Sequence, residues 1–304
     1  MDIVIDFFPP SVTVGSTPAT AQFGIRIMKK MKIIRVFISK TNATPNDDLV
    51  RINTLPSLFD EADEIHISVT FTWDIARAEQ LAEHWKFVAP VKVGGPAYNE
   101  KGGDFVAGMY MKNGYVITSR GCNNRCWFCS VPQREGYELR ELPIADGYII
   151  TDDNLLACSE KHINSVFEML KRQPQRPQFN GGLEAKLLTQ ELANKLYELK
   201  PVSMFFAYDT VSDYEPLIQA GKLLREAGFK KNHKITRCYV LIGYQGDTFA
   251  KAEKRLLQAW EAGFFPMSML YRDQEGKTLK DWKLFQRQWS YSTVAGAILK
   301  NYEK

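Results

Sequence analysis

The chain has 304 residues, of which 45% are hydrophobic and 24% are charged, and its formal net charge is +4 at pH 7. These values are ordinary for a folded globular protein and allow one large or two modest cores. The mild positive charge permits an anionic substrate but is well short of the charge of a nucleic-acid-binding protein. No apolar run is long enough for a transmembrane helix, and the run from Ile3 to Phe8 contains Asp6 where a signal peptide would be basic. Five cysteines, three of them clustered, favour a reducing cytoplasm over a disulfide framework.

The first hundred residues have the pattern of a small α/β unit. Two runs rich in β-branched residues, 32–39 and 64–72, predict buried strands. A third strand over 90–97 runs into a glycine turn. Between the last two strands we expect a helix whose apolar residues share one face: Ile75, Ala78, Leu81, Ala82 and Trp85. The order strand, helix, strand implies a parallel, Rossmann-like layer.

The most informative stretch is Cys122-Asn-Asn-Arg-Cys126-Trp-Phe-Cys129, with the spacing C-x3-C-x2-C. Three closely spaced thiolates can ligate three irons of a [4Fe–4S] cluster and leave the fourth iron open to a cofactor or substrate. A structural zinc site needs a fourth protein ligand, and no nearby Cys or His supplies it. A zinc knuckle and three unrelated thiols are the alternatives.

From about residue 113 the chain alternates strands with helices. A capping box at Ser212–Glu215 is predicted to open one helix, and residues 281–304 are predicted to form a terminal helical segment. The tetrapeptide Glu-Ala-Gly-Phe occurs at 226–229 and 261–264, each time closing a helix, which indicates successive units of similar build. Six strands are expected: 115–117, 147–151, 178–179, 202–208, 236–242 and 266–271.

The cysteine spacing, with Phe128 before the third cysteine, resembles the cluster loop of the radical S-adenosylmethionine (SAM) superfamily. The resemblance implies a [4Fe–4S] cluster on Cys122, Cys126 and Cys129, with SAM chelating the open iron. Reductive cleavage of SAM then yields a 5′-deoxyadenosyl radical that abstracts hydrogen from a substrate. The resemblance also implies an α/β fold with a partial (β/α)6 TIM-type barrel.

Three parts are expected on this basis. Residues 1–112 form a reduced Rossmann-like domain, residues 113–280 form the barrel, and residues 281–304 form the helical segment. The pattern ending in Gly94-Gly95-Pro96-Ala97 is similar to the later part of the cobalamin-binding domain of one superfamily branch. The D-x-H-x-x-G motif of that branch is absent and His66 lies in a strand pattern, so we expect no cobalamin binding.

Active sites of β/α barrels lie at the carboxyl ends of the strands, so the resemblance places the SAM contacts there. Asp152, Asp153 and Asn154 follow the second strand, where many members carry a Gly-Gly-Glu motif that binds the SAM amino group. A carboxylate suits an ammonium group because charge-assisted hydrogen bonds are strong; an ordinary acidic surface turn is the alternative.

The resemblance implies further contacts after the other strands. The backbone of Phe128 would contact adenine, and Asn180 would reach the SAM carboxylate or the substrate. Asp209 would bind the ribose hydroxyls. Ile242 and Gly243 begin a glycine turn that would also contact adenine.

The sequence therefore predicts a cytoplasmic radical SAM enzyme with one cluster, because Cys158 and Cys238 are too few for an auxiliary one. Its partners would be an unidentified small-molecule or modified-nucleoside substrate and an electron donor such as flavodoxin or ferredoxin. Two alternatives stay open. One is a cobalamin-dependent radical SAM methyltransferase that binds its corrin without the histidine. The other is a non-catalytic metal-binding or nucleic-acid-associated module.

Overall fold

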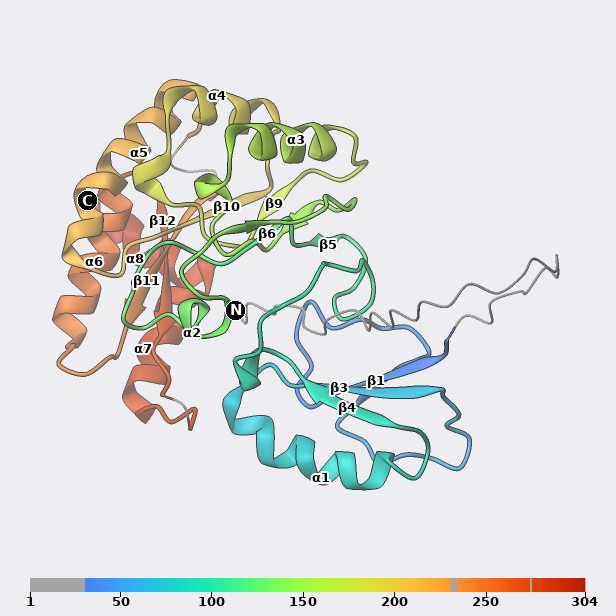
Figure 1. Ribbon diagram of the computed structural model, residues 1–304. Helices are drawn as coiled ribbons and strands as arrows, with labels where there is room; N and C mark the ends of the chain where they lie inside the picture. The colour runs from blue at the N-terminus through green and yellow to red at the C-terminus, as the bar shows by residue number, and fades with distance from the viewer. Residues whose placement is uncertain (1–30, 231–233, 274, 304) are drawn as a thin grey trace. The chain divides into compact units, whose positions relative to one another are not determined.

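The computed structural model describes residues 31–230, 234–273 and 275–303, so the run from Ile3 to Phe8 lies outside the described residues (Figure 1). The chain divides into two compact units. Of the described residues, the N-terminal unit comprises 31–104 together with 109–112, and the C-terminal unit comprises 105–108 and those from 113 onward.

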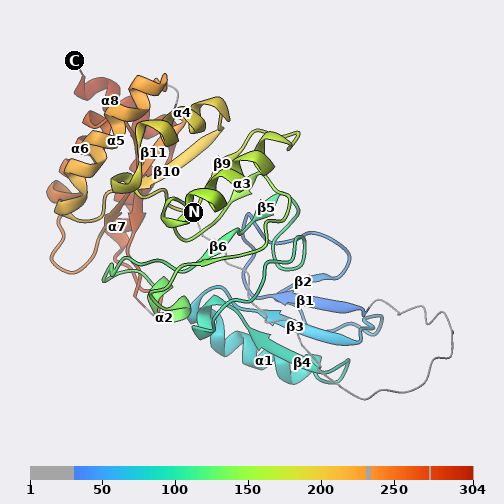
Figure 2. The same ribbon diagram turned by 45° about the horizontal axis from the view of Figure 1, so that its top comes forward.

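The N-terminal unit contains a four-stranded sheet in the order β2-β1-β3-β4, and every pair in it is parallel. One helix, α1 (Ile75–Trp85), lies against one face of this sheet (Figure 2). The parallel layer predicted from the strand–helix–strand order is thus confirmed, whereas β2 was not predicted. The strands are β1 (Ile33–Phe37), β2 (Val50–Ile52), β3 (Glu64–Ser68) and β4 (Val91–Gly94). Two 3₁₀ helices complete the unit: η1 (Thr72–Asp74) and η2 (Pro96–Tyr98).

The core of the N-terminal unit lies between the sheet and α1. Alternate residues of β1 and β3 point to the same face of the sheet, and on this face they are apolar and fully buried. From the helix, Leu81 and Trp85 pack into the same core and have no exposed surface. The apolar helix face predicted from the 3.6-residue period is therefore the buried one.

The C-terminal unit is built on a six-stranded sheet in the order β12-β11-β10-β9-β8-β5, again parallel throughout. The strands follow one another in sequence order across the sheet, and no pairing joins β5 to β12 within the described part of the chain. The strands are β5 (Tyr115–Val116), β8 (Ile149–Ile150), β9 (Gln178–Phe179), β10 (Ser203–Ala207), β11 (Thr236–Ile242) and β12 (Phe265–Leu270). A separate antiparallel pair joins β6 (Ser119–Arg120) to β7 (Arg140–Glu141).

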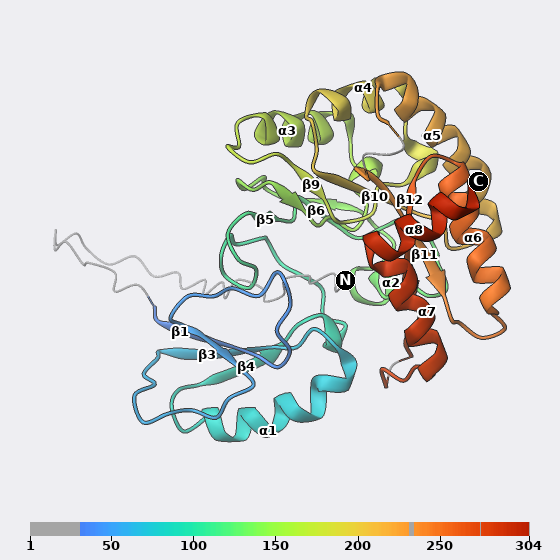
Figure 3. The same cartoon turned by 180° about the vertical axis from the view of Figure 1, so that it is seen from behind.

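Helices alternate with these strands, and α3 to α6 form a layer along the six-stranded sheet (Figure 1). At the end of the chain α7 packs on β12, and α8 packs on α7 (Figure 3). None of the described helices combines the length and the apolar character needed to cross a membrane. The α-helices are α2 (Val131–Glu135), α3 (Glu160–Lys171), α4 (Gln190–Glu198), α5 (Tyr214–Ala227), α6 (Phe249–Glu261), α7 (Lys280–Ser290) and α8 (Ser292–Tyr302). The 3₁₀ helices are η3 (Leu155–Ala157), η4 (Ala185–Leu187) and η5 (Val211–Asp213).

The repeated Glu-Ala-Gly-Phe segments end α5 and α6 in the same way. Gly228 and Gly263 have φ angles of 113° and 103°, a left-handed conformation that a glycine adopts without strain. The amides of Phe229 and Phe264 each donate back to a carbonyl five residues earlier, at 3.0 Å in both cases. This is the Schellman pattern of helix termination, so the sequence repeat marks a structural repeat.

The capping box predicted at Ser212–Glu215 is wrong. The structure forms one two residues earlier, where Thr210 and Asp213 exchange side-chain and backbone hydrogen bonds at the start of η5. Asp213 accepts from the amides of both Asp209 and Thr210, at 3.1 and 2.7 Å. Glu215 instead lies within the first turn of α5.

Candidate functional site

The carboxyl ends of the parallel strands in the C-terminal unit bring distant loops together. The cysteine loop follows β5 and β6, and residues 152–154 follow β8. Hydrogen bonds connect these two loops, and a further one connects the cysteine loop to the segment after β9. Because parallel strands end at one edge of a sheet, these loops form one site, as expected for β/α proteins.

The cysteine loop begins at a glycine that no other residue could replace without strain. Gly121 has a φ of 86°, and a Cβ atom at this position would meet the carbonyl oxygen of Glu138 at 2.2 Å. Beyond it Cys122, Cys126 and Cys129 are free thiols, and the amide of Cys129 donates to the carbonyl of Cys126 at 3.1 Å. The loop therefore presents three thiols within eight residues, the last two of them at the ends of one hydrogen-bonded turn.

The remaining cysteines are placed differently. Cys158 and Cys238 are buried free thiols, and Cys238 lies inside β11 with no exposed surface. Burial raises the pKa of Cys158 to about 12. Thiols of this kind behave as small apolar side chains rather than as ligands.

Asp152 is a buried carboxylate that holds the start of the cysteine loop. One oxygen accepts from the amide of Thr118 at 2.6 Å, and the other accepts from the hydroxyls of Thr118 and Ser119 at 2.6 and 2.7 Å. Burial raises its pKa to about 6, although these hydrogen bonds oppose the rise. Both oxygens of Asp152 are thus used within the protein.

Asp153 joins the two sides of the cysteine loop. It accepts from the amide of Gly121 at 2.8 Å and from the guanidinium of Arg134, on α2, at 3.2 Å. Both side chains of the ion pair are nearly inaccessible to solvent, at 4% and 3% exposed. Burial raises the pKa of Asp153, while Arg134 and the Gly121 amide lower it. Its carboxylate therefore bridges the residue before Cys122 and the helix after Cys129.

Asn154 is the turn residue that faces the first cysteine. Its amide nitrogen lies 3.5 Å from the sulfur of Cys122 and donates to Glu184 at 2.5 Å. The oxygen of its side-chain amide is buried and has no hydrogen-bond partner among the described residues. A buried acceptor without a donor costs free energy, so this oxygen is suited to a donor from a bound ligand.

Glu184 and Lys186, after β9, were not predicted but belong to this site. Lys186 pairs with Glu184 at 2.6 Å and donates to Asn124, in the cysteine loop, at 2.9 Å. Glu184 in turn holds Asn154 beside Cys122. This chain of contacts connects residues 62 positions apart; the only sequence signal was a pair of opposite charges after a weak strand.

Asn180 directly follows β9, next to the Asp152 turn. Its side-chain oxygen is a second buried acceptor without a hydrogen-bond partner in the described ranges. The close approach depends on the next residue, because a Cβ atom on Gly181 would meet the carbonyl oxygen of Asp152 at 2.0 Å. The structure therefore gathers Asn154 and Asn180 at neighbouring strand ends.

Asp209, Ile242 and Gly243 lie at the ends of β10 and β11. Asp209 accepts from the amide of Leu241 at 3.0 Å, and burial raises its pKa to about 7. Ile242 has no exposed surface. The amide of Gly243 donates to the buried Asp247 at 2.9 Å, which fixes the glycine turn.

The electrostatics of the cysteines show which strand ends lie close to them. The pKa of Cys126 is raised by partial loss of solvent and then by Cys122, Asp209 and Asp213, while Lys186 lowers it. Burial raises the pKa of Cys129 to about 11. Raised values favour the neutral thiol, and binding to a metal centre is what converts such thiols to thiolates.

The three thiols of the loop are the donor type that iron–sulfur clusters use. Among the residues that the structure describes, no group of three or more His, Cys, Asp or Glu side chains is arranged to hold one ion. Cluster cysteines each bind a different iron and so lie apart from one another. Three free thiols on one loop, with two unpartnered amide oxygens at adjacent strand ends, fit a cluster together with a polar cofactor.

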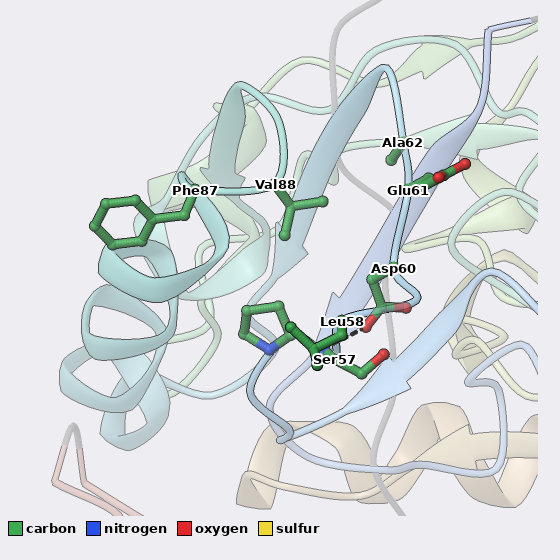
Figure 4. Close-up of a pocket in the computed structure, with 8 residues that line it drawn as sticks. Ser57, Leu58, Asp60, Glu61, Ala62, Phe87 and Val88 are labelled. Atoms are coloured by element: carbon green, nitrogen blue, oxygen red, sulfur yellow. Dashed lines mark hydrogen bonds between the residues drawn. The ribbon is translucent and has the colours of Figure 1, made fainter.

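A separate cavity of about 670 Å³ opens within the N-terminal unit (Figure 4). It lies where the chain enters β3 and β4, at the amino ends of these strands. Leu58 and Phe87 line it and are 100% and 82% exposed. Asp60 also lines it and is paired with Arg51 at 2.5 Å. Ligand sites of parallel sheets lie at the carboxyl ends instead.

Comparison with solved structures shows that the chain shares its fold with a radical SAM methyltransferase. That protein is TsrM from Kitasatospora setae, whose structure holds cobalamin and a [4Fe-4S] cluster. The TM-score is 0.57 at 12% sequence identity, and the match covers 80% of this chain and 76% of that one. No protein-family model matches the sequence, and no curated protein is significantly similar to it.

Proposed function

We propose that this protein is a radical SAM enzyme. The observation that carries the proposal is the loop of three free thiols at the carboxyl edge of a six-stranded parallel sheet. The sequential strand order and the layer of helices support identifying the sheet as a partial (β/α)6 barrel. The fold shared with TsrM also supports the proposal.

Cys122, Cys126 and Cys129 would hold a [4Fe–4S] cluster. When bound, the cluster and SAM would supply one-electron reductive cleavage to a 5′-deoxyadenosyl radical, which would act on a substrate. The chain prepares the loop for this role. Asp152 holds the segment that leads into it, Asp153 joins its two sides, and Lys186 holds its middle through Asn124.

Two buried side-chain oxygens without hydrogen-bond partners among the described residues support part of the proposed SAM contacts. The buried oxygen of Asn154 would accept from the SAM ammonium group, and Asn180 would reach the carboxylate or the substrate. Asp209 would bind the ribose hydroxyls through the oxygen that does not accept from Leu241. The backbones of Phe128 and of the turn at Ile242–Gly243 would contact adenine. The contacts of Asp152 and Asp153 with SAM stay predictions, because both carboxylates already bind the cysteine loop.

The proposed chemistry needs an electron donor such as flavodoxin or ferredoxin and a small-molecule or modified-nucleoside substrate. All five cysteines are free thiols, and a reducing cytoplasm keeps thiols in this state. We therefore propose a cytoplasmic enzyme.

A cobalamin-dependent methyltransferase is the second candidate. The fold shared with TsrM, whose structure holds cobalamin, is the observation that favours it. The N-terminal unit would have to bind the corrin without a histidine ligand, since both ring nitrogens of His66 are engaged by Tyr110 and Glu64, at 2.5 and 2.7 Å.

The cluster is tested by reconstituting the full chain anaerobically with iron and sulfide. We expect about four irons and four sulfides per chain. Replacing Cys122, Cys126 or Cys129 by Ala removes a ligand and should abolish the cluster. Cys158→Ala and Cys238→Ala are the matched controls and should retain it, because both thiols are buried and neither belongs to the cysteine loop.

Two outcomes would count against the proposal. Loss of iron from either control variant would mean that the ligands are wrongly assigned. A complete cluster that never cleaves SAM after reduction would favour a non-catalytic metal-binding or nucleic-acid-associated module. Cleavage is measured as release of 5′-deoxyadenosine and methionine.

A further inference from the structure

Three aromatic side chains meet beside the cysteine loop, and the functions proposed above use none of them. Trp127 lies between Cys126 and Cys129, Tyr244 lies in the turn after β11, and Tyr271 directly follows β12. The ring centroid of Trp127 is 5.5 Å from that of Tyr244 and 5.6 Å from that of Tyr271. We refer to these residues as the aromatic trio.

Trp127 remains largely open to solvent in spite of these contacts. Its exposed fraction is 60%, whereas tryptophan is a residue that proteins usually bury to a large extent. Tyr244 and Tyr271 are both partly buried. The trio thus offers one open aromatic surface, with two further rings supporting it from the side.

The ring geometry favours a flat ligand over a cationic one. Aromatic cages for cations enclose the ligand between ring faces, but here the rings touch, with centroids inside the 4.5–7 Å range of direct aromatic pairs. Tyr244 is also engaged already by a cation, because the guanidinium of Arg255 lies 5.3 Å from its ring centroid. A ligand can stack on the open surface of Trp127 but cannot enter between Trp127 and either tyrosine.

Buried hydrogen bonds hold the turn that carries Tyr244. Arg255 is buried and donates to the carbonyl of Leu241 at 2.8 Å and to Asp247 at 2.9 Å. Asp247 accepts from the amide of Gly243, the residue before Tyr244. A pre-positioned ring loses little conformational freedom when a ligand stacks beside it.

We propose that the aromatic trio binds a planar aromatic or heteroaromatic ring of the substrate, stacked on the exposed surface of Trp127. This inference rests on the proposed function, since it assigns the substrate class for that site. Trp127 is bracketed by two of the cluster cysteines, so a ring stacked there lies next to the reacting centre. The adenine of SAM is the other possible source of a planar ring, and the experiment separates the two.

The test measures binding of three small probes to the full chain by saturation-transfer NMR. Indole and adenosine carry planar rings, and cyclohexylmethanol is an apolar ring that is not flat. We expect both planar probes to bind the wild-type chain at least about fivefold more tightly than Trp127→Leu, because stacking on an aromatic side chain stabilises a bound base substantially. Cyclohexylmethanol should not distinguish the two proteins.

Tyr291→Leu is the matched control. Tyr291 is 61% exposed, close to the value for Trp127, but lies between α7 and α8. This variant should bind all probes as the wild type does. Tyr271→Leu provides a second variant and should weaken the planar probes by a smaller factor, since it removes only a supporting ring. Thermal unfolding of each variant checks that it is folded.

Three results would overturn the inference. Equal binding of the planar probes to wild type and Trp127→Leu would remove the trio from the site. If Trp127→Leu weakened the binding of cyclohexylmethanol as much as that of the planar probes, the surface would be apolar with no preference for flat rings. Displacement of indole by saturating SAM in the reconstituted protein would assign the surface to adenine. The probe experiments also work on the protein without iron, so they still decide the matter if the cluster proposal itself fails.

Discussion

The carboxylate of Asp153 could bind the SAM ammonium group or hold the cysteine loop, and its hydrogen bonds favour the second role. Binding of a SAM ammonium group would need an oxygen that faces the ligand. In the structure the two oxygens accept from Gly121 and Arg134. Removing one partner of a buried ion pair costs about 3–5 kcal/mol, because the other charge is left unpaired. Hydrogen bonds to charged groups contribute less, roughly 1.5–3 kcal/mol each.

We therefore expect Asp153→Ala to release the cysteine loop. The variant should take up less iron than the wild type and lose it faster to a chelator, since Arg134 and the Gly121 amide both lose their acceptor. Iron content and the rate of chelation are the measurements. Asp146→Ala, an exposed aspartate just before β8, is the control and should behave as the wild type does.

A different result for Asp153→Ala would support the SAM contact predicted from sequence. If Asp153→Ala assembles a complete cluster but binds SAM about ten- to hundredfold more weakly, the carboxylate contacts the ammonium group rather than the loop. The electron paramagnetic signal of the reduced cluster, followed during a SAM titration, distinguishes these results.

At the scale of elements, one buried ion pair connects β11, the glycine turn and α6. Arg255 of α6 is 8% exposed, and it donates to the carbonyl of Leu241 in β11 and to Asp247, whose side chain is fully buried. Such a pair adds little net stability compared with apolar residues, but losing one partner is costly.

Arg255→Met should therefore lower the free energy of unfolding by about 3–5 kcal/mol, because Asp247 remains as an unpaired buried charge. The double variant Asp247→Asn with Arg255→Met should recover part of this loss. Denaturant unfolding monitored by circular dichroism measures both. Lys171→Met, which breaks an exposed pair on α3, should change little; an equally small effect of Arg255→Met would show that the turn does not depend on the pair.

Elements with strong apolar patterns could be predicted closely from sequence. The expected strand 236–242 coincides with β11, because six of its seven residues are buried and the run is bounded by turn residues. The three-residue β2 was missed because Val50, Arg51 and Ile52 are too few to show a period. The capping box was misplaced because two overlapping segments, at 210–213 and 212–215, both match its pattern, and only the first forms.

The candidate site could be predicted only in part. The cysteine triplet is local in sequence, so its spacing was sufficient to find it. Glu184 and Lys186 reach the site only through contacts with Asn154 and Asn124, which no local pattern reveals. The aromatic trio was missed for the same reason, because its members come from three separate segments.

At the scale of the molecule, the N-terminal unit is a parallel α/β layer whose carboxyl edge is filled by its own chain. Gly95 follows β4 with a φ of 122°, and a Cβ atom there would meet the carbonyl oxygen of Val69 at 2.6 Å. The amide of Ala97 donates to the same carbonyl. Ser39 is tied to Asp74, and η1 contacts η2. The Gly94-Gly95 turn therefore serves the packing of this edge.

The side chain of His66, in the same unit, is held by hydrogen bonds within the unit. Burial lowers its pKa, although Glu64 opposes this shift, and both ring nitrogens are hydrogen-bonded, one to Tyr110 and one to Glu64. Glu64 also pairs with Lys92 at 2.7 Å. A histidine can bind a metal only through a ring nitrogen that is not already engaged.

These observations lead to an expectation for the full chain. Hydroxocobalamin mixed with the reconstituted protein should elute separately from it, and SAM cleavage should be the same with and without the corrin. The reason is physical: the carboxyl edge of the N-terminal sheet is filled, and its histidine has no free nitrogen. Absorbance of the protein peak after gel filtration and release of 5′-deoxyadenosine are the measurements. Retention of about one corrin per chain would instead favour the methyltransferase. His66→Ala would then decide whether the histidine is a ligand. Loss of the bound corrin in this variant would mean that Tyr110 and Glu64 release the His66 ring when the corrin binds.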